Sequence, residues 1–410
     1  MEKRVDISNP LSLDVGEEIN PDKISGDNVR IYPGCRIYGG ETVIAPGAQI
    51  GKEGPVTIED CQIGRNVELK GGYFKRAVFL QESEMGSGAH VREGSILEEA
   101  ARTAHCAGLK QTILFPFVTL GSLINFCDCL MAGGTGRKDH SEVGSSYIHF
   151  NFTPDGDKAT ASLIGDVPRG VMLSQRPIFL GGQGGMVGPV RVGYGNMVVA
   201  GTILRKDSPE DDRLIIGKAY REKITKVFPS RLLGLSRLIE NNVLYLSNLM
   251  ALEQWYVQVR RPFFGKEKFE GLIYSGAIGN LSLAKKERIK RIKEMVEKIP
   301  AVEEGHKNRV SDSAAREELH ERVEEVCELF GGIIPDEVGA VHRDSFLLEF
   351  EKSIKNSSQD YVRAIQGLPA KVSQEGTRWL QEIVDERCRQ AAVILPPMGL
   401  FKEKAPAKET

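Results

Sequence analysis

Residues 178–207 read IFLGGQGGMVGPVRVGYGNMVVAGTILRKD, and an aliphatic or methionine side chain recurs there at every sixth position. The recurring residues are Met186, Val192, Val198 and Leu204. An amphipathic helix repeats its apolar residues every three or four positions, and a half-buried strand repeats them every two. A period of six fits neither pattern. It fits a coil with flat faces of about six residues each, in which the aliphatic side chains point inward.

The same period runs through the chain before residue 100, where small or turn-forming residues often follow each aliphatic by three or four positions. Stacked coils of this kind bury a continuous apolar column and form parallel sheets. A glycine-rich β-sandwich with accidental spacing is the alternative, and several separate runs with one period weigh against it. The further hexads are Ile31 and Ile37; Ile44, Ile50 and Val56; Ile63 and Leu69; and Met85, Val91 and Leu97.

The period stops near the acidic residues 207–212, and the chain divides there. We predict an N-terminal segment at 1–20, a parallel β-helix over 21–208, a mostly α-helical region over 209–401 and a disordered tail at 402–410. Apolar stripes at helical spacing predict a bundle that could cap the β-helix, hold an oligomer together or bind a partner. Its helices are expected at 229–261, 282–299, 312–330, 344–357 and 374–392.

The composition narrows the class of partner and the compartment. The 410 residues carry a formal net charge of -2, which gives no general reason to expect a nucleic acid or an anionic membrane as a partner. No apolar run approaches the ~20 residues that span a bilayer, and the first residues lack the apolar core of a signal peptide. The seven cysteines are scattered and odd in number, which predicts reduced thiols in a cytoplasmic protein. We expect no structural metal, because Cys127 and Cys129 form the only close pair.

The hexads resemble those of the left-handed parallel β-helix acyltransferases. Residues 178–207 are similar to the closing coils of the acetyltransferase domain in the bifunctional bacterial N-acetylglucosamine-1-phosphate uridyltransferases. Residues 148–164 are similar to the projecting substrate loop of that domain, and we place this loop near 145–162. The resemblance covers residues 20–210, half the chain. It implies a left-handed β-helix, acetyl-CoA as co-substrate, and a homotrimer whose active site lies between subunits.

The loop region also carries the residues on which catalysis would depend. Asn151-Phe152 stands where the family has an asparagine–tyrosine pair, so the resemblance places Asn151 at the reacting sugar and gives Phe152 an aromatic face without a hydroxyl. The family's general base, a histidine, aligns with Phe126, which cannot accept a proton. His140 and His149 lie nearby and either could replace it, with His140 the first choice because carboxylates flank it. A solvated surface histidine is the alternative for each.

The resemblance assigns further positions to the acceptor and to the donor. Lys110 aligns with a family lysine near the sugar phosphate, and Lys158 falls within one place of a second such lysine. The other expected substrate residues are Asn125, Arg137 and Lys138. The pantetheine arm of coenzyme A lies between coils, where small side chains are needed. The matching positions here are Ser145, Gly182 and Ala200.

Three functions follow, in decreasing order of expectation. The first is an acyl-CoA-dependent N-acetyltransferase that acts on an amino-sugar phosphate or a nucleotide sugar. The second is a non-catalytic β-helix that binds a sugar nucleotide or serves as a scaffold, as Phe126 at the position of the family's base suggests. The third is UDP-N-acetylglucosamine pyrophosphorylase activity, which is least expected because the sequence contains no glycine-rich, basic signature of the uridyltransferase half.

Overall fold

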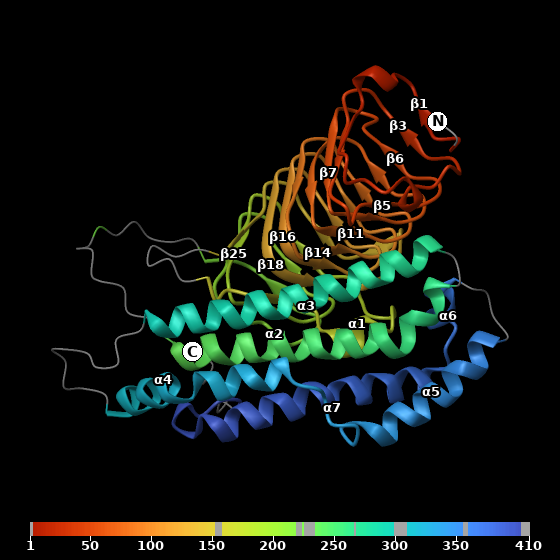
Figure 1. The fold of residues 1–410 in the computed structure, drawn as a ribbon. Coiled ribbons are helices and arrows are strands. Elements are labelled where there is room, and N and C mark those ends of the chain that lie inside the picture. The colour runs from red at the N-terminus through yellow and green to blue at the C-terminus, as the bar shows by residue number, and fades with distance from the viewer. Residues whose placement is uncertain are drawn as a thin grey trace.

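The computed structural model describes residues 3–151, 158–218, 224, 234–265, 268–298, 310–355 and 360–402. A left-handed parallel β-helix of about 11 coils occupies the first half, and a layered set of helices packs against its side (Figure 1). The predicted fold class is therefore confirmed.

Each coil passes through three faces, which we call A, B and C in chain order. Face A is a parallel sheet of eleven strands. These are β1 (Asp6–Ile7), β3 (Arg30–Ile31), β6 (Gln49–Ile50), β9 (Glu68–Leu69), β12 (Glu84–Met85), β15 (Arg102–Thr103), β17 (Thr119–Leu120), β21 (Glu142–Val143), β24 (Phe179–Leu180), β27 (Met197–Val198) and β29 (Leu214–Ile215).

Faces B and C share two long strands, β16 (Ala107–Leu114) and β18 (Ile124–Met131), which bend around the corner between them. Face B also holds β2 (Asp14–Val15), β4 (Arg36–Tyr38), β7 (Val56–Glu59), β10 (Gly72–Lys75), β13 (Ala89–Val91), β22 (Ile148–Phe150), β25 (Gly185–Val187) and β28 (Ile203–Leu204). Face C also holds β5 (Val43–Ile44), β8 (Gln62–Ile63), β11 (Ala77–Phe79), β14 (Ser95–Leu97), β23 (Ser162–Ile164) and β26 (Arg191–Val192).

The period of six places one aliphatic side chain per face inside the solenoid. Ile31, Ile50 and Leu69 pair in register on face A, and all three are buried. The corners between B and C need a backbone in the left-handed region, which is open to glycine and tolerated best by asparagine and aspartate among other residues. Asp60, Gly94 and Asp128 take this conformation in their coils, with φ of 53°, 77° and 58°.

Three excursions leave the coil, and all of them leave at corners. A hairpin of β19 (Gly134–Gly136) and β20 (Asp139–His140) leaves at the C–A edge. The predicted substrate loop leaves the B–C edge between β22 and β23. A third segment, between β23 and β24, carries the short helix α1 (Val167–Gly170) at the C–A edge.

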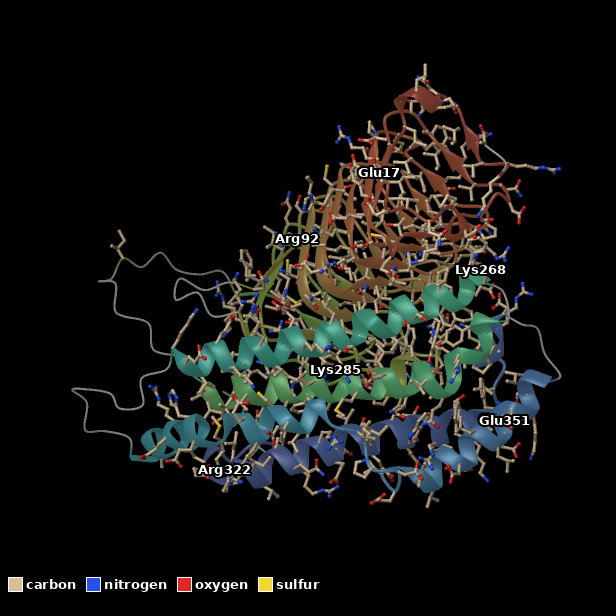
Figure 2. All side chains as sticks on the ribbon, viewed as in Figure 1. Glu17, Arg92, Lys268, Lys285, Arg322 and Glu351 are labelled. Carbon is tan, nitrogen blue, oxygen red and sulfur yellow. The ribbon has the colours of Figure 1, made fainter. Side chains whose placement is uncertain are left out.

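The helical half forms two layers beside face C. The inner layer is α2 (Leu235–Trp255) and α3 (Lys268–Glu297), which contact strands of face C. Lys285 of α3, labelled in Figure 2, forms an ion pair with Glu253 of α2 at 2.6 Å. The outer layer is α4 (Val310–Gly331), α5 (Ala340–Lys355) and α7 (Ala370–Ile394), with α6 (Tyr361–Gln366) at one end. Short turns complete the described part: η1 (Pro10–Ser12), η2 (Pro21–Lys23), η3 (Tyr256–Arg260), η4 (Arg261–Phe264) and η5 (Pro396–Met398).

A buried charge cluster anchors the end of α2 on the solenoid. Arg260, only 1 % exposed, forms ion pairs with Glu98 and Glu99. Tyr256 donates a hydrogen bond to Glu98 at 2.5 Å. A guanidinium in such surroundings is stable only while its carboxylates remain, so this cluster fixes the inner helices to the corner of the coil.

Several boundaries differ from those predicted. The solenoid uses residues 6–15 for its first strands and 214–215 for its last, so it is longer at both ends than 21–208. Helix α3 begins at Lys268 and not at 282, and α6 was not predicted.

The aromatic residues Trp255, Tyr256 and Trp379 of the helical half are buried in the packed interior. Within the described residues, no helix combines the length and apolar character needed to cross a bilayer.

Candidate active site

The predicted site residues fall on three different edges of one chain. Ser145, Gly182 and Ala200 follow strands of face A and lie at the A–B edge. Lys110, Asn151 and Lys158 lie at the B–C edge. Arg137, Lys138 and His140 belong to the hairpin at the C–A edge. Asn125 lies on the outer side of face B, and Phe152 lies outside the described residues.

The A–B edge is kept narrow by glycine and backbone contacts. The Gln183 amide donates to the Ser145 carbonyl, and the Gly201 amide donates to the Gly182 carbonyl, which stacks the predicted donor positions in one column. A Cβ on Gly181 would collide with the backbone nitrogen of Ala200, so no larger residue fits there. Small residues at these three positions are what an extended pantetheine arm between coils requires.

The same edge carries a histidine that sequence reasoning missed. The Ser122 amide donates to Ser145 Oγ at 3.1 Å, and Ser122 Oγ lies 2.9 Å from His105 Nδ1. His105 is exposed two coils before Ser145. An exposed imidazole oriented by a hydroxyl can accept a proton. The available signal was its position, two residues after the buried Thr103 of β15, where most coils have a small residue.

At the B–C edge the two described ends of the predicted loop are tied to the solenoid. Asn151 donates through Nδ2 to Asp128 Oδ2 at 3.1 Å, and Lys158, the first described residue after 151, is exposed. Lys110 lies in register with Cys127 and forms an ion pair with Glu93 at 2.9 Å. The loop ends and Lys110 therefore lie on one edge of the solenoid.

His149 is a core residue. Its Nδ1 lies against the Cys127 carbonyl, and its Nε2 lies 2.8 Å from Ser162 Oγ. Since Ser162 Oγ already accepts from the Val190 amide, its hydroxyl hydrogen is available to donate to Nε2, and the imidazole is neutral with its proton on Nδ1. Burial lowers the pKa of His149 to about 4. With both nitrogens paired inside the coil, His149 has no free atom with which to serve as the predicted base.

Phe126 lies in the same interior. It is fully buried and packs edge-on against Tyr147 and His149, with ring centroids 6.1 and 6.5 Å away. The outward neighbours on that strand are Asn125 and Cys127. The phenylalanine at the aligned position of the family's base is thus explained by core packing, and on that strand Asn125 and Cys127 are the side chains nearest it that face outward.

The hairpin at the C–A edge has a structural role for one of its predicted residues. Arg137 donates through Nη1 to the carbonyls of Ala100 and Phe117 and to Thr119 Oγ1, so its guanidinium holds the corner backbone. His140 lies 4.0 Å from Glu142 through Nε2, and its Nδ1 is buried without a hydrogen-bond partner. Lys138 is exposed. In the described part of the chain, no group of three or more His, Cys, Asp or Glu side chains could hold a metal ion.

The outer surface changes character over the last coils. Phe179, Met197 and Leu214 pair in register on face A, where they are 39 %, 56 % and 65 % exposed. Nearby on face B, Ile148 and Ile203 are also exposed. The corresponding outward residues of the earlier coils on face A are polar: Asp6, Arg30, Gln49, Glu68, Glu84, Arg102, Thr119 and Glu142. An exposed apolar column of this kind is typical of an interaction surface.

Comparison with known proteins shows that about half of this chain is similar to bifunctional GlmU proteins. The chain is 30% identical over 203 residues to the bifunctional protein GlmU of Pelobacter propionicus, 27% over 198 residues to that of Trichlorobacter lovleyi, and 25% over 185 residues to that of Thermotoga maritima. The solenoid has the features of a hexapeptide-repeat acyltransferase. An acyl-CoA donor is what a hexapeptide-repeat acyltransferase uses.

These matches are partial. They cover 48%, 48% and 45% of this chain but only 37%, 38% and 37% of the relatives' own length. No protein-family model matches the chain. Among solved structures, the polysialic acid O-acetyltransferase OatWY aligns with 57% of this chain at 14% identity and a TM-score of 0.17, a likeness too weak to support a conclusion.

Proposed function

We propose that the protein is an acyl-CoA-dependent N-acetyltransferase that acts on an amino-sugar phosphate or a nucleotide sugar resembling glucosamine-1-phosphate. The observation that carries this proposal is the B–C edge of the solenoid, along which both described ends of the projecting loop and Lys110 lie. Asn151 would hydrogen-bond the sugar. Lys110 and Lys158 would act as point charges for the phosphate.

The reaction needs a base, donors for an oxyanion and a place for the thioester. The acceptor amine attacks the thioester carbonyl carbon, a carbon–nitrogen bond forms, the carbon–sulfur bond breaks, and coenzyme A leaves as its thiol. The amine proton passes to a histidine and from it to the departing thiolate; the first candidate for this histidine is His140, which lies at the C–A edge. His105 is the second, because it shares the A–B edge with Ser145.

A homotrimer would bring the separated edges together. Within one chain the donor column at the A–B edge and the loop at the B–C edge lie on different corners. The exposed apolar column of Phe179, Met197 and Leu214 adjoins the A–B edge and supports a contact with a second copy there. The site would then combine the donor edge of one subunit with the loop of its neighbour.

The test is thiol release from acetyl-CoA in the presence of glucosamine-1-phosphate. We expect turnover by the wild type and a loss of at least about 100-fold in kcat for His140→Ala, in the range typical of a general base. His105→Ala is measured in parallel, and His342→Ala, which pairs with Glu375 in the outer helices, is the control. Loss in His105→Ala alone assigns the base to the A–B edge, and absence of turnover by the wild type with all amino-sugar phosphates contradicts the proposal.

A non-catalytic sugar-nucleotide-binding or scaffold protein is the second candidate. It is favoured by the burial and full pairing of His149, which leaves no predicted base beside Asn151 within one chain. Its signature is a UDP-sugar that raises the melting temperature without thiol release from acetyl-CoA.

A further inference from the structure

Helix α3 keeps step with the coils of the solenoid. Gly276 lies against the side chain of Gln62 in β8, and Asn280 donates to the carbonyls of Arg76 and Ser95. Arg288 reaches Asp128 at the start of the C-face part of β18. From Gly276 to Arg288 an α-helix rises about 18 Å. The four strand spacings from β8 to β18 cover about 19 Å, so the helix meets successive coils with successive turns.

Arg288 holds both described ends of the projecting loop. Its Nη2 forms an ion pair with Asp128 Oδ1 at 2.5 Å, and its Nη1 donates to the carbonyl of Lys158 at 2.8 Å. The other oxygen of Asp128 accepts from Asn151. The Arg288 guanidinium is therefore bonded directly to Lys158 and, through the Asp128 carboxylate, to Asn151.

The inner helices add a second tie at the same place. Asn242 of α2 is fully buried and donates through Nδ2 to the Ala159 carbonyl at 2.9 Å. Both inner helices thus bond to the few residues where the loop rejoins face C. The side chains of Arg288, Asp128 and Asn242 therefore all lie at this one corner.

The bonding of Arg288 is better suited to fixing the positions of the loop ends than to holding α3 on the solenoid. A buried ion pair is costly to desolvate, and apolar residues of the same volume would hold two elements together as well or better. Arg288 is 2 % exposed and Asp128 is 7 % exposed. The planar fork of arginine fixes the direction of two hydrogen bonds at once, which a lysine cannot do. Such a fork sets the position of a backbone carbonyl and a carboxylate relative to each other.

We propose that Arg288 is a positioning residue for acceptor binding: through Asp128 and the Lys158 carbonyl it sets the Asn151 amide and the Lys158 ammonium for the sugar phosphate. The helical half is then required for the acceptor and not for the donor. This inference rests on the proposed acetyl transfer.

The experiment compares full-length wild type with Arg288→Gln and Arg288→Lys. Acetyl transfer to glucosamine-1-phosphate gives kcat and both KM values, and amide hydrogen exchange is followed in peptides covering 148–151 and 158–164. We expect the acceptor KM to rise about tenfold in Arg288→Gln, with the KM for acetyl-CoA changed less than about twofold. Arg288→Lys keeps the charge but not the fork, so its acceptor KM should rise by an intermediate factor. Exchange in the two peptides should become about tenfold faster in Arg288→Gln.

Asn280→Ala is the matched control. It lies on the same helix and also removes buried hydrogen bonds to solenoid carbonyls, but away from the loop. We expect a lower melting temperature with unchanged KM values and unchanged exchange in these peptides. If Arg288→Gln does not fold, Asn242→Ala replaces it, because its bond to Ala159 reaches the same corner.

The outcomes separate the two proposals. An active wild type with an unchanged acceptor KM in Arg288→Gln overturns the positioning role and leaves the acetyltransferase standing. A wild type without turnover removes the acetyltransferase, and hydrogen exchange then decides the role of Arg288 by itself. Faster exchange confined to the loop flanks supports it, and exchange equal to that of Asn280→Ala overturns it.

Discussion

The position of His149 within the six-residue repeat determines whether its side chain points into the coil or out of it. On β22 the imidazole points into the interior of the solenoid, while Ile148 and Phe150 point outward. It lies in register with Met186, a residue of the hexad series. The excursions between these two residues break the count of six, so the sequence alone could not tell that His149 shares the phase of Met186. Once the strands are paired, the inward direction of the side chain follows.

The neutral state of His149 predicts acid sensitivity. Burial depresses the pKa of His149 from 6.5 to about 4 and Arg288 lowers it further, while the Cys127 carbonyl and Asp128 raise it. The unfolded chain therefore binds this proton at higher pH, and stability present above pH 6.5 is lost as the pH falls toward 4. The loss amounts to up to about 3 kcal/mol.

Urea unfolding at pH 7 and pH 4.5 checks this for the wild type and His149→Gln. We expect the free energy of unfolding to fall more steeply with acid in the wild type, because glutamine can occupy the same polar site without titrating. Parallel changes in the two proteins would show that another group is responsible.

At the scale of elements, glycine permits the close approach of a neighbouring element in both halves of the chain. In the solenoid, Gly181 lets the backbone of the next coil approach at Ala200. In α3, Gly276 lets the helix approach Gln62 on face C. Helix-breaking composition over 268–281 is what hid the first half of α3, because the glycines of that stretch argue against a helix until the packing partner is known. The hexads identified the coils and the apolar stripes identified most of the helices, but the first half of α3 could not be predicted from its own pattern.

Replacement of Gly181 by alanine tests the coil spacing. Its added methyl group would meet backbone atoms of the next coil, which cannot rotate away as a side chain can. We expect Gly181→Ala to lower the free energy of unfolding by roughly 3 kcal/mol or to prevent folding. Gly136→Ala is the control, because a Cβ there has nothing within 4 Å. Equal melting temperatures for the two variants would contradict the tight stacking of this edge.

At the scale of the molecule, the helices pack along one side of the solenoid (Figure 1), where they cover face C. The apolar column of the last coils stays exposed on face A. The sequence predicted both halves, and the resemblance predicted a trimer. The sequence could not predict which face of the solenoid the helical half would cover. That depends on contacts between residues far apart in the chain, such as the ion pairs of Arg260 with Glu98 and Glu99 and of Arg288 with Asp128. The predicted site residues likewise could not be assembled from one chain, since their edges diverge.

Charge on the apolar column tests the assembly. Met197 stands between Phe179 and Leu214 and is 56 % exposed, so an aspartate there leaves the coil interior unchanged but places charge in any interface. We expect the wild type to sediment with the mass of three chains and Met197→Asp with the mass of one. Glu142→Asp, on the same face where the outward residues are polar, is the control. A wild type that sediments as a single chain would rule out the trimer.

The matched rise of α3 and the solenoid also limits how the protein can change length during evolution. A duplication or deletion of one whole coil is tolerated in a simple β-helix, because every coil presents the same corners to its neighbours. Here such a change would move Asp128 by one strand spacing relative to Arg288 and separate the ion pair. Related chains with this helical half should therefore vary in coil number only before β8 or after β26, or should gain and lose a helical turn of α3 together with a coil.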